Sequence, residues 1–548
     1  MTRWSAPELT TMRSVLSTGA EKAPDKIALH IDDEALTYSE LYHRGVSAAV
    51  GLHSLGIRPG DAVGVFAHNS TDLLATMFGC AFLGAVYTPI NVDYTGEFLR
   101  HQLATAEARV VLTDAALIDE IGCVASKLPD LAHVIARPGG TSPPAAGPEI
   151  RGVSIHPVAE VYAPATQLPA GPDPRGDSVS AVIFTAGTTG PSKGVAMSQN
   201  YLCASAKQVF DLRGATADST VYAAFPLFHL AAISLVVLGP LTATATGALD
   251  NRFSPNKFWS RVHHFAADQT VLLGAMSTML WNRPEQEDDA ENPVQVATIA
   301  PMPPAVHRAF EKRFGLTVLQ LYAQSEAYPL TIAPASAPAL PGSSGKPNPL
   351  FTVKLFDEHD AEVPVGEVGE VVVRPNAPHV MFEGYYRNPE ATASVWRNGW
   401  MHTGDLGKFD DDGYFYFVDR KKDYLRRRGE NISSFEVEQV ARQYEPVADV
   451  AVIAAPSEVT EDEVVACVTV KGDETFDCEA FFHHCAANMP YFAVPRYVWI
   501  LPDLPRNPVG RVEKYKLRDT LRTADMATLD GLWDARMHGC VAPRRRVS

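Results

Sequence analysis

A loop rich in small and hydroxyl residues carries the clearest chemistry in the sequence. Residues 184–195 read FTAGTTGPSKGV, and the strand-like run VSAVIFT leads into them. Glycines let backbone N–H groups turn toward an anion, and hydroxyls with a lysine add further donors. It is not a Walker loop, because Ser192 precedes Lys193 and Gly194 follows it. The pattern favours phosphate binding over a flexible linker. The candidate phosphate-binding residues are Thr185, Gly187, Thr188, Thr189, Gly190, Ser192 and Lys193.

Four further motifs follow this loop along the chain: FPLFH, YAQSE, GWMHTGDL and LPRNPVGRVEKYKLR. Each is weakly specific alone, but five motifs in this order are highly specific. Together they resemble the adenylate-forming superfamily of acyl-CoA synthetases, adenylation domains and luciferases, over about residues 10–520. The stretches PINVDYTGEFLRHQL and DRKKDYLRRRGENIS are most similar to the crotonobetaine/carnitine-CoA ligase-type branch.

The resemblance implies a ligase reaction in two steps. A carboxylate attacks the α-phosphate of ATP to give an acyl-adenylate and pyrophosphate, and a thiol, usually that of CoA, then displaces AMP. Such chemistry demands positioning and charge neutralisation. We therefore expect ATP and Mg²⁺ as cofactors, CoA as co-substrate and a small carboxylic acid as substrate.

The resemblance also assigns nucleotide-binding roles. The loop would cradle the β- and γ-phosphates, Tyr322 would lie against adenine, and Ser325 would contact the α-phosphate where the family usually has threonine. Glu326 would bind Mg²⁺, a hard cation that prefers oxygen ligands. Asp405 would accept both ribose hydroxyls with the help of Arg420, although an aspartate in a glycine-containing loop is by itself more often a turn former.

Other residues are assigned to the acid pocket and the second step. By resemblance, His229 lines the acyl pocket as an aromatic gate. Lys422 is the hinge about which a C-terminal domain rotates between the steps. Arg426 and Gly429 belong to RRRGE, which would swing beside the thiol channel, with Gly429 letting pantetheine pass close to the backbone. By composition alone, three arginines are equally a solvated face.

One departure from the family concerns its catalytic lysine. The family usually has Pro-x-x-Gly-Lys near the C-terminus, and its lysine bridges the carboxylate and the α-phosphate, whereas this chain reads PVGR ending at Arg511. Arginine keeps the charge but is a planar fork rather than a compact point. Either Arg511 does the work or Lys514 replaces it. In a helix the two positions share a face, and in an extended segment they point oppositely.

Other departures affect the pocket. Thr298 and Ile299 stand where the family commonly has glycines, near the expected acyl and adenine pockets. Their side chains should narrow the space, so we expect a short or compact acid rather than a long fatty chain. Ala186 replaces a serine of the loop, and Ala323 replaces the usual glycine of YAQSE.

The composition of the chain limits the classes of partner that it is expected to bind. The chain has 548 residues, 46% of them hydrophobic, and a net charge of −17, which disfavours nucleic acid and anionic membranes as partners. Residues 230–249 are apolar but contain Gly-Pro and threonines, so we predict a buried helix and strand rather than a membrane span.

Seven scattered cysteines without a Cys-x-x-Cys pair indicate a reducing cytoplasm. Adjacent His483, His484 and Cys485 diverge on a helix, which disfavours a metal clip. A homodimer is compatible with the sequence.

The order of elements predicts the architecture. Helices alternate with strands in the first half, which predicts layered parallel α/β subdomains. Short alternating strands after residue 350 predict a small β subdomain, and a fresh α+β unit begins beyond Lys422. We expect an N-terminal adenylation domain over residues 1–421, a mobile C-terminal domain over 422–522 and a tail over 523–548.

Three functions remain open from the sequence. The first is an ATP- and Mg²⁺-dependent acyl-CoA ligase. The second keeps adenylation but uses another acceptor: a carrier-protein thiol, an amine, or nitrite activated for diazotisation. The third is a non-catalytic nucleotide-binding relative, suggested by Arg511 and the missing glycines. CoA-dependent AMP release separates the first two, and ATP binding without pyrophosphate release would indicate the third.

Overall fold

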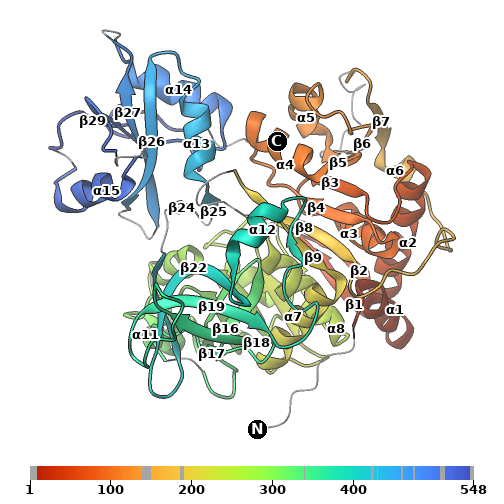
Figure 1. The fold of residues 1–548 in the computed structure, drawn as a ribbon. Helices are drawn as coiled ribbons and strands as arrows, with labels where there is room; N and C mark the ends of the chain where they lie inside the picture. The colour runs from red at the N-terminus through yellow and green to blue at the C-terminus, as the bar shows by residue number, and fades with distance from the viewer. Residues whose placement is uncertain are drawn as a thin grey trace.

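The chain folds into a large α/β body and a smaller α+β unit at its C-terminal end (Figure 1). In Figure 1 the smaller unit is blue and stands beside the body, with α13 and the short strands β24 and β25 at the junction. The computed structural model describes residues 9–138, 150–185, 191–338, 340–420, 425–428, 430–457, 461–472, 475–506, 512–526 and 528–543.

The first large sheet of the body has eight strands within these residues, and it carries the loop singled out by sequence. The strands β8, β4, β3, β5, β6 and β7 run parallel to one another, while β9 and β20 form an edge in which neighbouring strands pair antiparallel. In spatial order the strands are Gly384–Tyr385 (β20), Lys193–Ser198 (β9), Val179–Thr185 (β8), Val86–Pro89 (β4), Ala62–Phe66 (β3), Val110–Asp114 (β5), His133–Arg137 (β6) and Ser154–Pro157 (β7).

The second large sheet has seven strands in the described part of the chain. All are parallel except β2, which forms an antiparallel pair with β1. In spatial order they are Thr317–Leu319 (β14), Val296–Ala300 (β13), Gln269–Leu273 (β12), Thr220–Ala223 (β10), Thr246–Leu249 (β11), Ile27–Ile31 (β1) and Glu34–Thr37 (β2).

Helices form layers between and outside the two sheets. The middle layer holds Met12–Lys22 (α1), Tyr38–Ser54 (α2), Thr71–Leu83 (α3), Gln199–Leu212 (α7), the π-helical segment Ala232–Leu238 and Gly239–Thr242 (α8). The outer layers hold Gly96–Ala106 (α4) and Ile118–Ala125 (α5) on the first sheet, and Phe258–His264 (α9), Gly274–Trp281 (α10) and His307–Phe314 (α11) on the second. Short helices lie at Ala115–Leu117 (η1), Val158–Val161 (α6) and Pro389–Val395 (α12).

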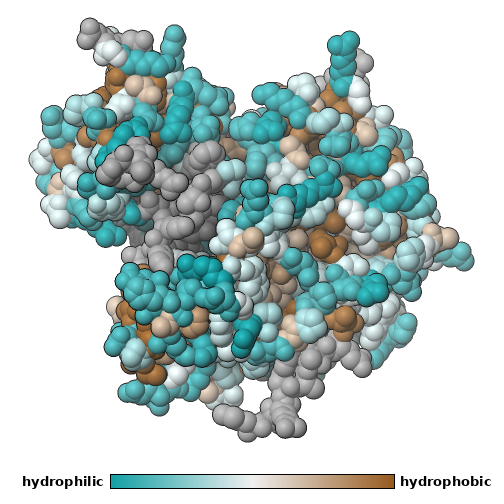
Figure 2. All heavy atoms as spheres, viewed as in Figure 1, coloured by the Kyte–Doolittle hydropathy of each residue, from teal (hydrophilic) through white to brown (hydrophobic). Residues whose placement is uncertain are grey.

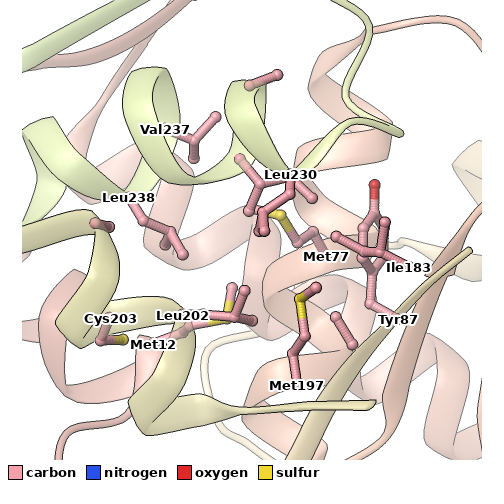
Figure 3. Packing of buried hydrophobic residues seen from close by; sticks show 14 of the residues in the cluster. Met12, Met77, Tyr87, Ile183, Met197, Leu202, Cys203, Leu230, Val237 and Leu238 are labelled. Carbon is pink, nitrogen blue, oxygen red and sulfur yellow. The ribbon is translucent and has the colours of Figure 1, made fainter. Parts of the chain in front are cut away.

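Side chains from both sheets meet in the middle layer. Figure 3 shows Met77, Met197 and Leu230 converging there beside Ile183. Burial of each such side chain contributes about 1.5–3 kcal/mol of hydrophobic free energy. The middle-layer core therefore fixes the two sheets against each other, and with them the loops at their strand ends.

Two smaller sheets complete the body. The larger of them confirms the predicted β subdomain, because its strands follow residue 350 and pair with one another. The larger one comprises Phe351–Phe356 (β18), Gly369–Pro375 (β19), Trp400–Phe409 (β22), Trp396–Arg397 (β21) and Phe415–Arg420 (β23). The other comprises Leu321–Gln324 (β15), Ala327–Ile332 (β16) and Lys346–Pro347 (β17).

The C-terminal unit is a four-stranded sheet with helices and a preceding hairpin, counted over its described residues. Strand β29, which lies within the segment expected as a tail, pairs with β28. The elements are Leu425–Arg427 (β24), Glu430–Ile432 (β25), Ser434–Ala441 (α13), Val447–Pro456 (β26), Asp462–Val470 (β27), Cys478–Asn488 (α14), Tyr497–Ile500 (β28), Lys514–Thr523 (α15) and Leu532–Asp534 (β29). The expected domain boundary, between residues 421 and 422, lies outside the described residues.

Local sequence signals hold in the structure. Thr37 caps α2, with the N–H of Glu40 donating to its hydroxyl at 3.1 Å, while the N–H of Thr37 donates to the Glu40 carboxylate at 2.8 Å. The apolar run 230–249 forms the buried π-helical segment, α8 and β11, as predicted.

The visible face of the molecule is mostly polar. Figure 2 shows a face covered mostly by polar residues, with hydrophobic residues in small separate groups. Among the described residues, we find no helix with the length and apolar character needed to cross a membrane.

Candidate active site

A cavity of about 1250 Å³ lies between the large body and the C-terminal unit. Its body side is built from segments that follow the carboxyl ends of β1, β3, β5, β10, β11 and β12, the edge where parallel α/β sheets bind ligands. Its other side comes from the C-terminal unit, and the described residues there are Arg427, Arg428, Glu430, Ser457, Glu461, Asp462, Glu463, Tyr491 and Arg536. Apolar residues Phe228 and Met276 line it together with many charged ones.

Carboxylates outnumber cations on the cavity wall. The described lining includes nine carboxylates and five arginines but no lysine, so its formal charge is 5 − 9 = −4 with histidines neutral. The carboxylates are Asp32, Asp33, Glu34, Asp93, Asp114, Glu430, Glu461, Asp462 and Glu463. The arginines are Arg137, Arg252, Arg427, Arg428 and Arg536.

The ends of the predicted phosphate loop are held by a strand pair. Thr185 ends β8 and lies opposite Lys193, which begins β9. Ser192 is buried, its carbonyl oxygen lies 2.8 Å from Nε2 of His101 on α4, and its N–H donates to Oε1 of Glu436 at 3.1 Å. Sequence reasoning missed Glu436 and His101, which lie far from the loop in the chain. The expected residues Gly187, Thr188, Thr189 and Gly190 lie outside the described residues.

Glu326 lies beside the loop, close to a positive charge. The hydroxyl of Tyr385 donates to its Oε1 at 2.7 Å, and Nζ of Lys193 lies 4.8 Å from the centroid of the Tyr385 ring. Burial raises the pKa of Glu326, while the Tyr385 hydrogen bond and the Lys193 charge oppose the rise. The adjacent Ser325 accepts a hydrogen bond from the Tyr201 hydroxyl through its backbone carbonyl at 2.9 Å. Tyr385 was not found by sequence because β20 pairs with β9 from far along the chain.

A second polar cluster surrounds Asp405. This residue is 1% exposed, and its Oδ2 accepts from the Tyr322 hydroxyl at 2.8 Å and from Nε2 of Gln324 at 2.7 Å. The Tyr322 ring lies 5.0 Å from Phe415, between centroids. Residue 420 lies opposite Asp405 in the strand ladder, so the backbone brings Arg420 to this cluster. The structure thus brings Tyr322 and Asp405 together, and Gln324 is the member that sequence reasoning did not single out.

His229 contacts the C-terminal unit. Its Nε2 lies 3.3 Å from Oε1 of Glu430 on β25, and its ring lies 4.5 Å from that of Phe228, between centroids. Arg426 has partners within the C-terminal unit: its Nε lies 3.7 Å from Oε1 of Glu461, and its backbone N–H donates to the Asp462 carboxylate at 2.9 Å.

The neighbouring Arg427 and Arg428 lie in different environments. Arg427 is buried and lies 2.7 Å from Glu463, and burial lowers its pKa to about 10 although Glu463 opposes this. Arg428 stacks over the Tyr491 ring at 5.3 Å from its centroid. The hairpin β24–β25 is therefore anchored in the C-terminal unit while Glu430 faces the body. Lys422 and Gly429 lie outside the described residues.

Lys514 lies within the C-terminal unit. It is the first residue of α15, and its Nζ lies 2.7 Å from Oε1 of Glu438 and 2.8 Å from the hydroxyl of Ser434, both on α13. Helix α15 begins at Lys514, and Arg511 lies outside the described residues. That the two positions share a helix face therefore stays a prediction.

The substitutions expected to narrow the pocket are both buried in β13. Ile299 packs among Phe310 and other residues of the core beneath α11, on the outer face of the sheet, and Thr298 faces the opposite way. Neither residue lines the cavity between the two units.

Comparisons with known proteins identify the family. The profile of the AMP-binding enzyme family matches residues 16–386, and that of the AMP-binding enzyme C-terminal domain matches residues 436–511. The chain belongs to the AMP-binding enzyme family. Crotonobetaine/carnitine–CoA ligase of Escherichia coli O8 (strain IAI1) is 30% identical over 488 residues, covering 88% of this chain and 93% of that protein. The predicted resemblance is confirmed.

Solved structures of AMP-binding enzymes share this fold. ATP-bound MatB from Rhodopseudomonas palustris has a TM-score of 0.67 and 27% identity, over 94% of this chain and 99% of that one. The amide bond synthetase McbA from Marinactinospora thermotolerans has a TM-score of 0.78 and 24% identity, over 93% of this chain and 99% of that one. The predicted α/β architecture with a large N-terminal and a small C-terminal part is confirmed, and the chain is an adenylate-forming ligase of the acyl-CoA synthetase type.

Proposed function

We propose that this AMP-binding enzyme joins a carboxylic acid with an apolar acyl group to CoA. An acid oxygen attacks the α-phosphorus of ATP and pyrophosphate leaves, and the thiol sulfur then attacks the acyl carbonyl and AMP leaves. The contact between His229 and Glu430 carries the proposal. It places the β24–β25 hairpin, expected beside the thiol channel, at the cavity where the strands of the body end. Phe228, Leu273 and Met276 supply the apolar wall for the acid.

We assign the nucleotide to the two polar clusters. Asp405 has the buried carboxylate to accept the ribose hydroxyls, with Tyr322 beside it for adenine and Arg420 assisting from the next strand. Lys193, with Thr185 and Ser192, flanks the loop that would hold the β- and γ-phosphates, and Ser325 would contact the α-phosphate. Each charge-assisted bond to phosphate contributes about 1.5–3 kcal/mol.

Glu326 fits a Mg²⁺ ligand. Its carboxylate offers the hard oxygen donors that Mg²⁺ prefers, and a cation would offset the burial that raises the pKa of this group. Bound Mg²⁺ would neutralise phosphate charge as pyrophosphate leaves. Tyr385 orients the carboxylate by donating to Oε1.

We propose that Arg511 takes the part of the family lysine in the first step. Lys514 is already paired with Glu438, and both partners belong to the C-terminal unit. Rotation of that unit about Lys422 therefore carries the pair along and does not free Lys514.

The charge of the cavity wall favours a second acceptor class. CoA carries several phosphate charges, which the excess of carboxylates on this wall disfavours although Arg261 and Arg496 pair with Asp33 and Glu463, whereas a cationic amine is attracted. In that case an amine nitrogen attacks the acyl-adenylate, giving an amide, AMP and a proton.

One assay separates these outcomes. AMP release from enzyme, ATP, Mg²⁺ and acid is followed with CoA, with amines, or with neither. Acceleration by CoA supports the ligase, acceleration by an amine alone supports the amide synthetase, and no pyrophosphate release with any acid contradicts both.

A further inference from the structure

A carboxylate of the C-terminal unit occupies the end of the phosphate loop. Glu436 lies in the first turn of α13, and its Oε1 accepts from the backbone N–H of Ser192 at 3.1 Å, across 244 positions of sequence. Ser192 directly precedes Lys193, and it is itself buried. This N–H is a donor that points to an anion supplied by the other unit of the protein.

A carboxylate oxygen and a phosphate oxygen accept the same kind of hydrogen bond from such a donor. Both are anionic acceptors that form short, charge-assisted bonds to a backbone N–H. One N–H cannot donate well to both, and two anions at one donor repel each other. Pyrophosphate on this amide and Glu436 on this amide are therefore alternatives.

Helix α4 connects the same donor to the docked unit. His101 lies 2.8 Å from the Ser192 carbonyl oxygen, through Nε2. Phe98, one turn earlier on α4, packs inside the hydrophobic core of the C-terminal unit with Ile432 and Phe492. A single helix thus holds the loop end on one side and the C-terminal unit on the other, so the Glu436 contact belongs to a continuous interface.

We propose that Glu436 is a positioning residue for the second step, and that its carboxylate takes the hydrogen bond on the Ser192 amide that a pyrophosphate oxygen holds in the first step. The C-terminal unit then adopts the present arrangement only once pyrophosphate has left. The inference rests on the proposed role of residues 185–193 in phosphate binding.

The test uses inorganic pyrophosphate with Mg²⁺ as the probe, so it does not require the acid. Calorimetric affinities are measured for the full-length wild type, E436Q, E436D and E445Q. E436Q keeps the shape and loses the charge, E436D keeps the charge and withdraws it by one methylene, and E445Q alters an exposed carboxylate just after α13. Amide hydrogen exchange of residues 425–441 reports docking directly.

Removal of the competing carboxylate in E436Q, or its withdrawal in E436D, should tighten pyrophosphate binding by about tenfold or more, and E445Q should bind like the wild type. Pyrophosphate should speed exchange of residues 425–441 in the wild type, and E436Q should exchange fast without it. Equal affinities in all four proteins, with exchange indifferent to pyrophosphate, would overturn the inference while leaving the phosphate site standing. No pyrophosphate binding by any protein would overturn the phosphate site and the inference together.

Discussion

Replacement of Lys514 should destabilise the C-terminal unit without stopping acyl-adenylate formation. Its ammonium lies 2.7 Å from the carboxylate of Glu438, which is 7% exposed and also accepts from the N–H of Val452 at 2.8 Å. K514M removes the nearer cation from this buried carboxylate and leaves Arg442, whose Nη2 lies 3.9 Å from Oε2 of Glu438. Breaking a buried pair costs about 3–5 kcal/mol. Because a fifth of Lys514 is exposed and Val452 still donates, we expect about 2–3 kcal/mol.

The assay combines melting with partial-reaction kinetics. For a unit of about 100 residues, 1 kcal/mol shifts Tm by about 4–8 °C, so the C-terminal transition should fall by roughly 10–20 °C. ATP–pyrophosphate exchange at 20 °C, with an acid that supports turnover, should stay near wild type. K516M is the matched control, because Lys516 lies on the same helix but pairs with Glu513 at the surface. It should leave both readings unchanged.

Two further variants complete the design. E438Q combined with K514M removes both charges, so the double variant should be more stable than the sum of the single losses predicts. R511A should slow ATP–pyrophosphate exchange by about a hundredfold or more, as loss of a charge-stabilising donor does, and R511K should retain it. The reasoning is refuted if K514M melts like the wild type yet loses exchange while R511A keeps it.

Three other perturbations test the site and the fold. D405N should raise KM for ATP by about tenfold or more with a smaller change in kcat, since Tyr322 and Gln324 would remain but the ribose would lose an anionic acceptor; an unchanged KM would remove Asp405 from the nucleotide site. E326Q should raise the Mg²⁺ concentration for half-maximal pyrophosphate release several-fold, and an unaltered Mg²⁺ titration would count against that ligand. Burial alone would raise the pKa of Asp114, but the His68 hydrogen bond and the Arg137 charge hold it below its ordinary value. D114N should therefore lose about 1–3 kcal/mol of stability at pH 7, and the difference should vanish as pH falls through about 3.9 toward the lower folded pKa, because the protonated wild type loses the same interactions. Denaturant unfolding between pH 7 and 3 measures this, and a difference independent of pH would contradict it.

Short-range signals in the sequence predicted much of the fold. The capping pair of Thr37 and Glu40, the alternation of helices with strands and the strands after residue 350 all depend on neighbours within a few positions. Lys193 and Thr185 also lie together for a local reason, because they are the two ends of one hairpin loop.

Partners brought by distant segments were not predictable in this way. Tyr385 reaches Glu326 only because β20 joins the edge of the first sheet, and Glu436 reaches Ser192 only because α13 docks against the body. The orientation of the Ile299 side chain was not predicted either. Its position in a motif indicated a pocket, but side chains alternate between the two faces of β13, and that of Ile299 packs in the core beneath α11.

Pyrophosphate release with ATP and Mg²⁺, over a panel of short, aryl and betaine-like acids with and without CoA, tests the central claim most directly. The account predicts release that requires an acid and accelerates with CoA. Acid-dependent release indifferent to CoA would keep the adenylation site and shift the acceptor to the amine that the cavity charge favours. ATP binding without pyrophosphate release for any acid would contradict the claim that this chain activates carboxylates.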